Sequence, residues 1–338
     1  MDLDDTGYRR NLDSTNLMAA IGALPGSISA AWAAGQAVDW PERWHGARHI
    51  VLAGMGPAAM AAEIAAERLR GICSAAVLTW HNFEMPRAVN AESLVIVLSP
   101  EGDDEEAVSA AVAAEEQGAD VAALTRGGEL AATAQANGWP VDDVIPDVRG
   151  QAAAGPLAVG VLGALARLRL CPDLTGEVAD SAEALREQQE QLRAEAPVTS
   201  NPAKRMAGQL MDRVPLIFAA APLAPIARHW KSQINVMAKA PAMAETVPAM
   251  DHSTIAGTVH PEGLISKFMV VALRSTFTHP RAQWMVDQTR QVYLTAGFNT
   301  DAVEGTGATP LAHMLTALHY GEYAAYYLAL CYEADPSA

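Results

Sequence analysis

The feature of this sequence that most constrains the fold is a regular alternation of short apolar runs with longer stretches of helical character. The apolar runs span residues 49–54, 75–80, 93–99, 120–125 and 142–146. Alanine- and glutamate-rich stretches such as residues 58–71 and 104–118 lie between them. Short, continuous apolar strands separated by helices are typical of a parallel sheet that helices cover on both faces. We therefore predict a doubly wound α/β domain over residues 46–170.

A second α/β domain is predicted over residues 198–338, ending in a C-terminal helix. Its strands are expected at residues 214–221, 233–238, 266–275 and around 296–304, with helices at 203–211, 280–297 and 310–336. Polar residues over 171–197 predict a linker helix between the two domains. An N-terminal helical segment is expected over residues 1–45, with a break at Pro25 and Gly26.

Composition and charge exclude several classes of partner. The 338 residues carry a formal net charge of −16, whereas nucleic-acid binding requires a basic surface. No apolar run approaches the roughly 18 residues of a membrane span, and the N-terminus does not resemble a secretory signal. The three cysteines are widely spaced, and neither cysteines nor histidines show the spacing of a metal site. We expect a cytoplasmic protein without nucleic-acid, membrane or metal partners.

A glycine turn between a predicted strand and helix is the first candidate binding motif. Gly54, Gly56 and Ala58 lie in the sequence AGMGPAA. Glycines permit a tight turn, and the amide groups at the start of the following helix attract anions. The spacing also fits a dinucleotide fingerprint, but no acidic residue stands at the end of the next predicted strand. Dinucleotide binding is therefore a remote alternative.

A polar stretch over residues 230–257 carries a family resemblance. It resembles the pattern WKxQxNENAKxPA followed by PExNHNEIxG in the bifunctional phosphoglucose/phosphomannose isomerases, a branch of the sugar isomerase (SIS) superfamily. The positions in register are Trp230, Lys231, Gln233, Asn235, Ala238, Lys239, Pro241, Ala242, Pro248, His252, Ile255 and Gly257. The resemblance implies two SIS-type α/β domains with parallel sheets flanked by helices, a homodimer, a sugar or sugar-phosphate ligand and no cofactor.

The resemblance also implies which positions would carry catalysis. The family's catalytic glutamate corresponds to Val236, and the arginine that stabilises the enediolate corresponds to Gln151, with Arg149 as a nearby substitute. His252 matches the ring-opening histidine, which in these folds is donated across the dimer interface. The family's closing helix continues to a catalytic lysine, whereas this sequence ends at Ala338, so the resemblance implies that the lysine is absent.

The segment SPEGDDEE, residues 99–106, matches the family's phosphate loop SYSGNTEE. Ser99 and Gly102 are retained, whereas Glu101 and Asp104 replace a serine and a threonine. Two unit charges ~5 Å apart interact by roughly 3 kcal/mol at an effective dielectric of 20, so these carboxylates should repel a phosphate. As a structural alternative, Asp103 or Asp104 caps the helix that begins here.

These positions favour a SIS protein that binds a carbohydrate derivative with little or no isomerase activity, in a binding, regulatory or structural role. The competing hypothesis is an active glucose 6-phosphate and mannose 6-phosphate isomerase in which Glu245 or Asp251 serves as the base.

Overall fold

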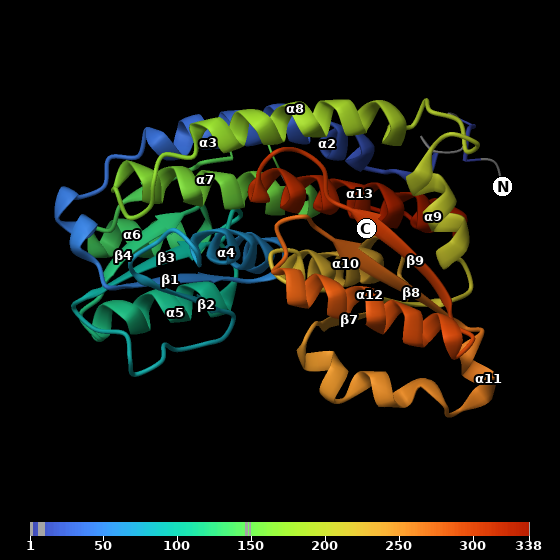
Figure 1. Cartoon of the computed structure of the whole chain (residues 1–338). Helices are drawn as coiled ribbons and strands as arrows, with labels where there is room; N and C mark the ends of the chain where they lie inside the picture. The colour runs from blue at the N-terminus through green and yellow to red at the C-terminus, as the bar shows by residue number, and fades with distance from the viewer. Residues whose placement is uncertain (1–2, 6–10, 146–147, 149, 338) are drawn as a thin grey trace. The chain divides into compact units, whose positions relative to one another are not determined.

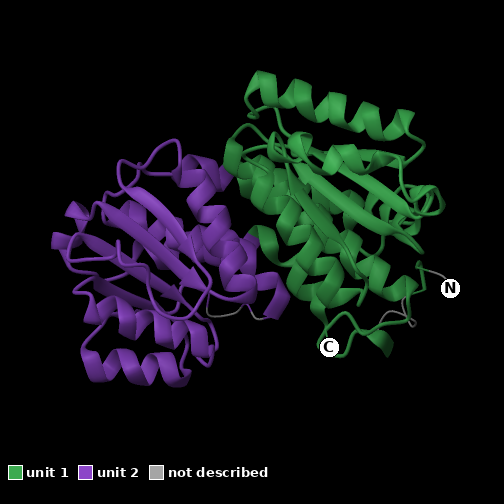
Figure 2. Ribbon diagram, turned by 90° about the horizontal axis from the view of Figure 1, so that it is seen from below, with its two compact units in different colours: residues 1–25, 180–338 green, residues 26–179 purple. Residues whose placement is uncertain are grey.

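The computed structural model describes residues 3–5, 11–145, 148 and 150–337. The chain forms two compact units, unit 1 with residues 1–25 and 180–338, and unit 2 with residues 26–179 (Figures 1 and 2). Each unit has its own parallel sheet with helices packed against it. The predicted fold class, two α/β units with parallel sheets flanked by helices, is confirmed.

Unit 2 contains the sheet that was predicted first along the chain. Its strand order is β2-β1-β3-β4-β5, and every neighbouring pair is parallel. The strands are β1 His49–Gly54, β2 Ala76–Trp80, β3 Ser93–Leu98, β4 Asp120–Leu124 and β5 Val141–Asp142. All of β3 is buried, as expected for a strand with helices on both faces.

The last strand of this sheet lies earlier than predicted. It ends at Asp142, so the expected strand over 142–146 is wrong within its described residues. Val144 and Ile145 follow the strand and are buried, which accounts for the apolar run in the sequence. A Cβ on Gly160 would lie 2.5 Å from Val144, so Val144 packs tightly against the helix that contains Gly160.

The remaining elements of unit 2 are largely helical, as predicted. They are α3 Leu24–Gln36, η1 Glu42–Gly46, α4 Gly56–Leu69, α5 Glu105–Glu116, α6 Gly128–Asn137, η2 Gly150–Ala153 and α7 Ala154–Arg167. Helix α8 Thr175–Leu192 begins in unit 2 and belongs to unit 1 from Asp180 onward. Pro25 does not break a helix, because it lies in the first turn of α3, where proline lacks only an unneeded amide hydrogen. The break falls instead at Ala23, between α2 Leu17–Gly22 and α3.

Unit 1 contains a four-stranded parallel sheet of order β7-β6-β8-β9. Its strands are β6 Val214–Ala219, β7 Met243–Thr246, β8 Phe268–Arg274 and β9 Asn299–Glu304. The strand expected at 233–238 is wrong, because Gln233 to Met237 form the end of helix α10 Ala224–Met237. The apolar residues Ile226, Trp230 and Ile234 recur at helical spacing and are buried.

Unit 1 contains further helices, and its long C-terminal helix is largely buried. They are α2 Leu17–Gly22, α9 Pro202–Leu210, α11 Glu262–Ile265, α12 Pro280–Thr295 and α13 Pro310–Cys331, with 3-10 turns η3 Ala249–His252 and η4 Thr254–Thr258. Helix α13 contacts α9 and α10, and nearly all of its residues are buried. Within the described ranges, no helix is long and apolar enough to cross a membrane.

Candidate functional site

The glycine turn and the SPEGDDEE loop lie at the same edge of the unit 2 sheet. Strand β1 lies between β2 and β3. The chain therefore adds β2 on one side of β1 and the later strands on the other side, which makes β1 the topological switch point of the sheet. In open α/β sheets, ligands bind at this point, beyond the carboxyl ends of the strands. Gly54 ends β1, and Ser99 directly follows β3.

The glycine turn has the geometry that its sequence predicts. A Cβ on Gly54 would lie 2.7 Å from the carbonyl oxygen of Leu98, so the two strands approach too closely for a side chain. Gly56 has a φ of 53°, which favours glycine. Pro57 lies in the first turn of α4, and Ala58 is buried. The turn therefore leaves few amide donors for an anion.

Ser99 is the buried centre of the loop after β3. Its hydroxyl group donates a hydrogen bond of 2.6 Å to Oδ2 of Asp104, and its oxygen accepts one of 3.1 Å from the amide of Gly102. Gly102 has a φ of 83°, and a Cβ there would lie 1.9 Å from the carbonyl oxygen of Gly127. The loop therefore needs glycine at this position, and its only retained hydroxyl has committed its hydrogen to Asp104.

Asp104 is the N-cap residue of helix α5, as the capping alternative places it, but its side chain makes no capping hydrogen bond. It bonds to Ser99 instead. Asp103 turns toward the start of α6, where Oδ1 accepts a hydrogen bond of 3.3 Å from the amide of Glu129.

Glu101 pairs with Arg126, a residue that the sequence did not single out. The mostly exposed carboxylate of Glu101 forms an ion pair with the largely buried guanidinium of Arg126. Nη1 of Arg126 also donates a hydrogen bond of 3.0 Å to the carbonyl oxygen of Val148. Arg126 lies just after β4, so its place at the end of a parallel strand could have indicated it. Because Arg126 offsets the charge of Glu101, repulsion of an anion at this loop rests chiefly on Asp104.

A second group that the sequence missed, His81, lies beside the glycine turn. Nδ1 of His81 donates a hydrogen bond of 3.0 Å to the carbonyl oxygen of Gly54, and Nε2 lies 3.6 Å from Oε1 of Glu63. The carboxylate of Glu63 raises the pKa of His81 above its ordinary value, although burial opposes this effect. The sheet edge thus holds a histidine–carboxylate pair suited to proton transfer.

The polar stretch of unit 1 has a largely structural role in α10. Nε1 of Trp230 donates a hydrogen bond of 2.8 Å to the carbonyl oxygen of Ala317, and its ring stacks on Tyr320 at 5.7 Å. Val236 is half-buried and offers only hydrocarbon, while Met237 is fully buried.

The other candidate catalytic residues of unit 1, which are Glu245, Asp251 and His252, lie in β7 and η3. His252 is exposed at the end of η3 and makes no hydrogen bond within the described part of the chain. Oε1 of Glu245 accepts a hydrogen bond of 2.8 Å from Oγ1 of Thr254, and Asp251 accepts one of 2.7 Å from Oγ1 of Thr289. Both candidate bases are already hydrogen-bonded.

Gln151 is half-buried in η2 of unit 2, and Arg149 lies outside the described residues. Across the described ranges, no three histidine, cysteine, aspartate or glutamate side chains are grouped so that they could hold a metal ion.

The sequence and the fold are similar to those of known sugar-phosphate isomerases. Two bifunctional phosphoglucose/phosphomannose isomerases are 27% identical to this chain, one from Caldicellulosiruptor bescii over 93% of each chain and one from Aquifex aeolicus over 75% of each. A glucose 6-phosphate isomerase-like protein from Thermus thermophilus has a TM-score of 0.66 at 21% identity and covers 100% of this chain and 98% of its own.

A more distant structure shares the fold. The C-terminal domain of a glucosamine-fructose-6-phosphate aminotransferase from Francisella tularensis has a TM-score of 0.72 at 13% identity, over 96% of this chain and 98% of its own. Residues 199–338 match the family model of the bacterial phospho-glucose isomerase C-terminal SIS domain. The chain is therefore similar over most of its length to the bifunctional phosphoglucose/phosphomannose isomerases, and its residues 199–338 match a SIS domain.

Proposed function

We propose that this protein binds a carbohydrate derivative and has little or no glucose 6-phosphate or mannose 6-phosphate isomerase activity. The hydrogen bond from Ser99 to Asp104 carries this proposal. A phosphate at the loop would have to displace a hydrogen bond to a charged group, which contributes ~1.5–3 kcal/mol. It would then lie beside the Asp104 carboxylate, at a further cost of roughly 3 kcal/mol for charges ~5 Å apart.

The positions expected to carry catalysis support the same proposal. Val236 has no group that can remove a proton, and Gln151 carries no charge to stabilise an enediolate. General acid–base catalysis commonly contributes about 10²- to 10⁴-fold, and an aligned electrostatic group contributes a comparable factor. The loss of both should leave little isomerisation.

An active isomerase is the competing proposal, and the pair of His81 and Glu63 favours it. This pair brings an acid–base group to the carboxyl edge of the sheet. In this alternative, His81 moves the proton that Val236 cannot.

The test is a coupled assay that measures conversion of glucose 6-phosphate and mannose 6-phosphate to fructose 6-phosphate. We expect turnover far below the common enzyme range of roughly 1 to 10³ s⁻¹. A kcat within that range that falls at least about a hundredfold in His81→Gln would instead establish the competing proposal.

We also propose that the protein acts as a cytoplasmic homodimer. The resemblance to the isomerases supports both parts of this proposal. The three free cysteines support the cytoplasmic location. The exposed apolar side chains Val259 and Leu264 in unit 1 support the dimer. Light scattering of the full chain should give twice the monomer mass, and Leu264→Glu should shift it toward the monomer. A monomer at all concentrations would refute the dimer.

A further inference from the structure

Unit 1 contains a cavity of about 400 Å³ whose described lining includes no residue of the polar stretch 230–257. One face of α8, the edge strand β9 and α13 form it. The residues that give it polar character are Glu187, Gln188, Gln191, Glu304, Thr306 and Tyr320. A volume of about 300 to 1,000 Å³ is typical of sites for small molecules.

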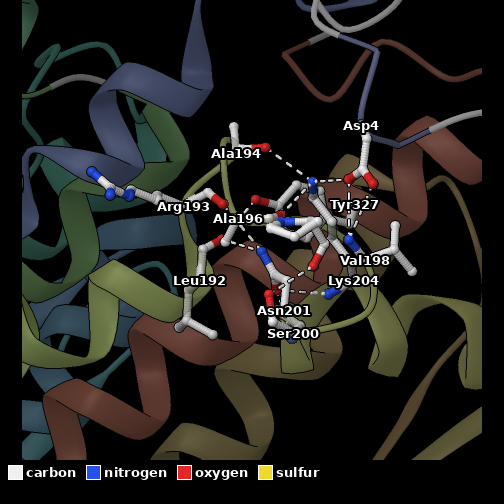
Figure 3. Close-up of polar contacts among 12 residues, drawn as sticks. Asp4, Leu192, Arg193, Ala194, Ala196, Val198, Ser200, Asn201, Lys204 and Tyr327 are labelled. Atoms are coloured by element: carbon white, nitrogen blue, oxygen red, sulfur yellow. Dashed lines mark hydrogen bonds and ion pairs between the residues drawn. The ribbon is translucent and has the colours of Figure 1, made fainter.

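The wall of the cavity is held in place by buried hydrogen bonds at the end of α8 (Figure 3). Asn201 is fully buried, and Nδ2 donates a hydrogen bond of 2.8 Å to the carbonyl oxygen of Leu192, a residue of the lining. Lys204 donates to Asp4 at 2.7 Å and to the carbonyl oxygen of Ala194 at 2.9 Å. These bonds fix the end of α8 to the start of α9, so the cavity does not depend on a ligand for its shape.

The cavity presents hydrogen-bond acceptors. Oε1 of Gln188 is buried and has no hydrogen-bond partner within the described part of the chain. The hydroxyl group of Tyr320 donates its hydrogen to the carbonyl oxygen of Pro202 at 2.9 Å, so only its lone pairs face a ligand. The exposed carboxylate of Glu187 adds a negative charge beside them. A ligand that satisfies these three acceptors must donate hydrogen bonds.

The charges around the cavity are negative on balance. Among the described residues that line the cavity, there is no lysine, arginine or histidine. Glu304 pairs with Arg274 at 2.6 Å, but the same guanidinium also pairs with Asp287 at 3.0 Å. Burial raises the pKa of Tyr320, and the nearby carboxylate of Asp301 raises it further, by more than Arg205 lowers it.

We propose that this cavity binds a small organic cation that carries amino or guanidino groups. The cation places one group between the carboxylate of Glu187 and Oε1 of Gln188, which satisfies the buried acceptor. Sugar phosphates are excluded here, because an anion would meet carboxylates and lone pairs. The net charge of −16 raises the local concentration of cations further. This site is independent of the loop at Ser99.

Calorimetric titration of the full chain with agmatine, which carries one amino and one guanidino group, tests the proposal. We expect one agmatine to bind per chain, and butane-1,4-diol and glucose 6-phosphate not to compete for the site. Glu187→Gln and Gln188→Leu should each weaken binding about tenfold, equivalent to ~1.4 kcal/mol. Glu183→Gln is the matched control, because Glu183 is an exposed carboxylate one turn earlier on α8 and outside the lining; it should leave the affinity unchanged.

Absence of agmatine binding at about 10 mM would overturn the proposal. Binding that both lining substitutions leave unchanged, or that Glu183→Gln weakens equally, would show only diffuse attraction to an acidic protein and would also overturn it. A lysine-rich peptide that binds where agmatine does not would assign the cavity to a protein partner instead. Glu183 and Glu187 are exposed and Gln188 is half-buried, and thermal unfolding confirms that each of the three variants is folded.

Discussion

Acidification should destabilise unit 1 through His319, a histidine that is fully buried in α13. Nε2 of His319 donates a hydrogen bond of 3.1 Å to the carbonyl oxygen of Ile21, and Nδ1 is buried without a partner in the described chain. Protonation would place a charged N–H group in the core with no acceptor. Burial accordingly lowers the pKa of His319 from 6.5 to about 4.

The sign and size of the effect follow from these two pKa values. Because the folded pKa is lowered, the stabilisation is present above the unfolded pKa of 6.5 and is lost as the pH falls toward about 4. In this window the unfolded chain binds one more proton than the folded chain, so each pH unit removes ~1.4 kcal/mol. Between about pH 7.5 and about pH 5, the loss is roughly 2 kcal/mol.

The measurement compares the free energy of unfolding of the wild type with that of His319→Gln in urea at these two pH values. Glutamine can donate the same hydrogen bond to Ile21 but does not titrate, so the difference between the two proteins isolates His319. This difference also removes the opposite contribution of His81, whose raised pKa adds stability as the pH falls. His252→Gln is the control, because His252 is exposed and makes no hydrogen bond to a residue that the structure describes. Equal pH dependence in the wild type and His319→Gln would refute the reasoning.

Two further substitutions and one labelling reaction test the packing inside each unit. Gly321→Ala would place a Cβ 2.1 Å from Nε1 of Trp230, so overpacking should lower the free energy of unfolding by ~1–3 kcal/mol in urea denaturation; an unchanged value would contradict the tight contact. Lys204→Met leaves the carbonyl oxygens of Ala194 and Ala196 without their donor. It should lower the free energy of unfolding by ~1–3 kcal/mol in the same assay, and an unchanged free energy would contradict the importance of these hydrogen bonds. Burial raises the pKa of the Cys171 thiol to about 12, so iodoacetamide should label it only after unfolding; mass spectrometry that finds rapid labelling of the folded protein would refute this burial.

The architecture was predictable because its signals are local. Continuous apolar runs such as residues 93–99 indicated buried parallel strands, and the glycine turn marked the junction of β1 and α4. The strand predictions failed where an apolar run is compatible with either a strand or a buried helix. The run 233–238 is apolar enough for a strand, but its residues continue the helical spacing of Trp230. Strand β7 was missed because it is a partly exposed edge strand without an apolar run.

The site was less predictable, because its decisive contacts join separate loops. The sequence placed carboxylates at residues 101 and 104 but did not show that they point in different directions. Glu101 meets Arg126 from the loop after β4, whereas Asp104 turns inward to Ser99. His81 and Glu63 come from different elements and meet only in the folded sheet. Such pairings depend on tertiary contacts that residue spacing does not encode.

The central claim is that Asp104 prevents phosphate from binding at the SPEGDDEE loop, because it holds the Ser99 hydroxyl and carries a negative charge. The affinity for glucose 6-phosphate tests this claim most directly. Isothermal titration should detect no tight binding at this loop in the wild type. Asp104→Thr frees the Ser99 hydroxyl and removes one charge, so affinity should rise on the order of a hundredfold, equivalent to ~3 kcal/mol.

The matched controls separate this contact from general charge. Asp103→Thr removes the same charge but leaves the bond between Ser99 and Asp104, so it should change the affinity much less. Adding Glu101→Ser to Asp104→Thr should give little further gain, since Arg126 already offsets Glu101. Tight glucose 6-phosphate binding by the wild type that Asp104→Thr leaves unchanged would contradict the account.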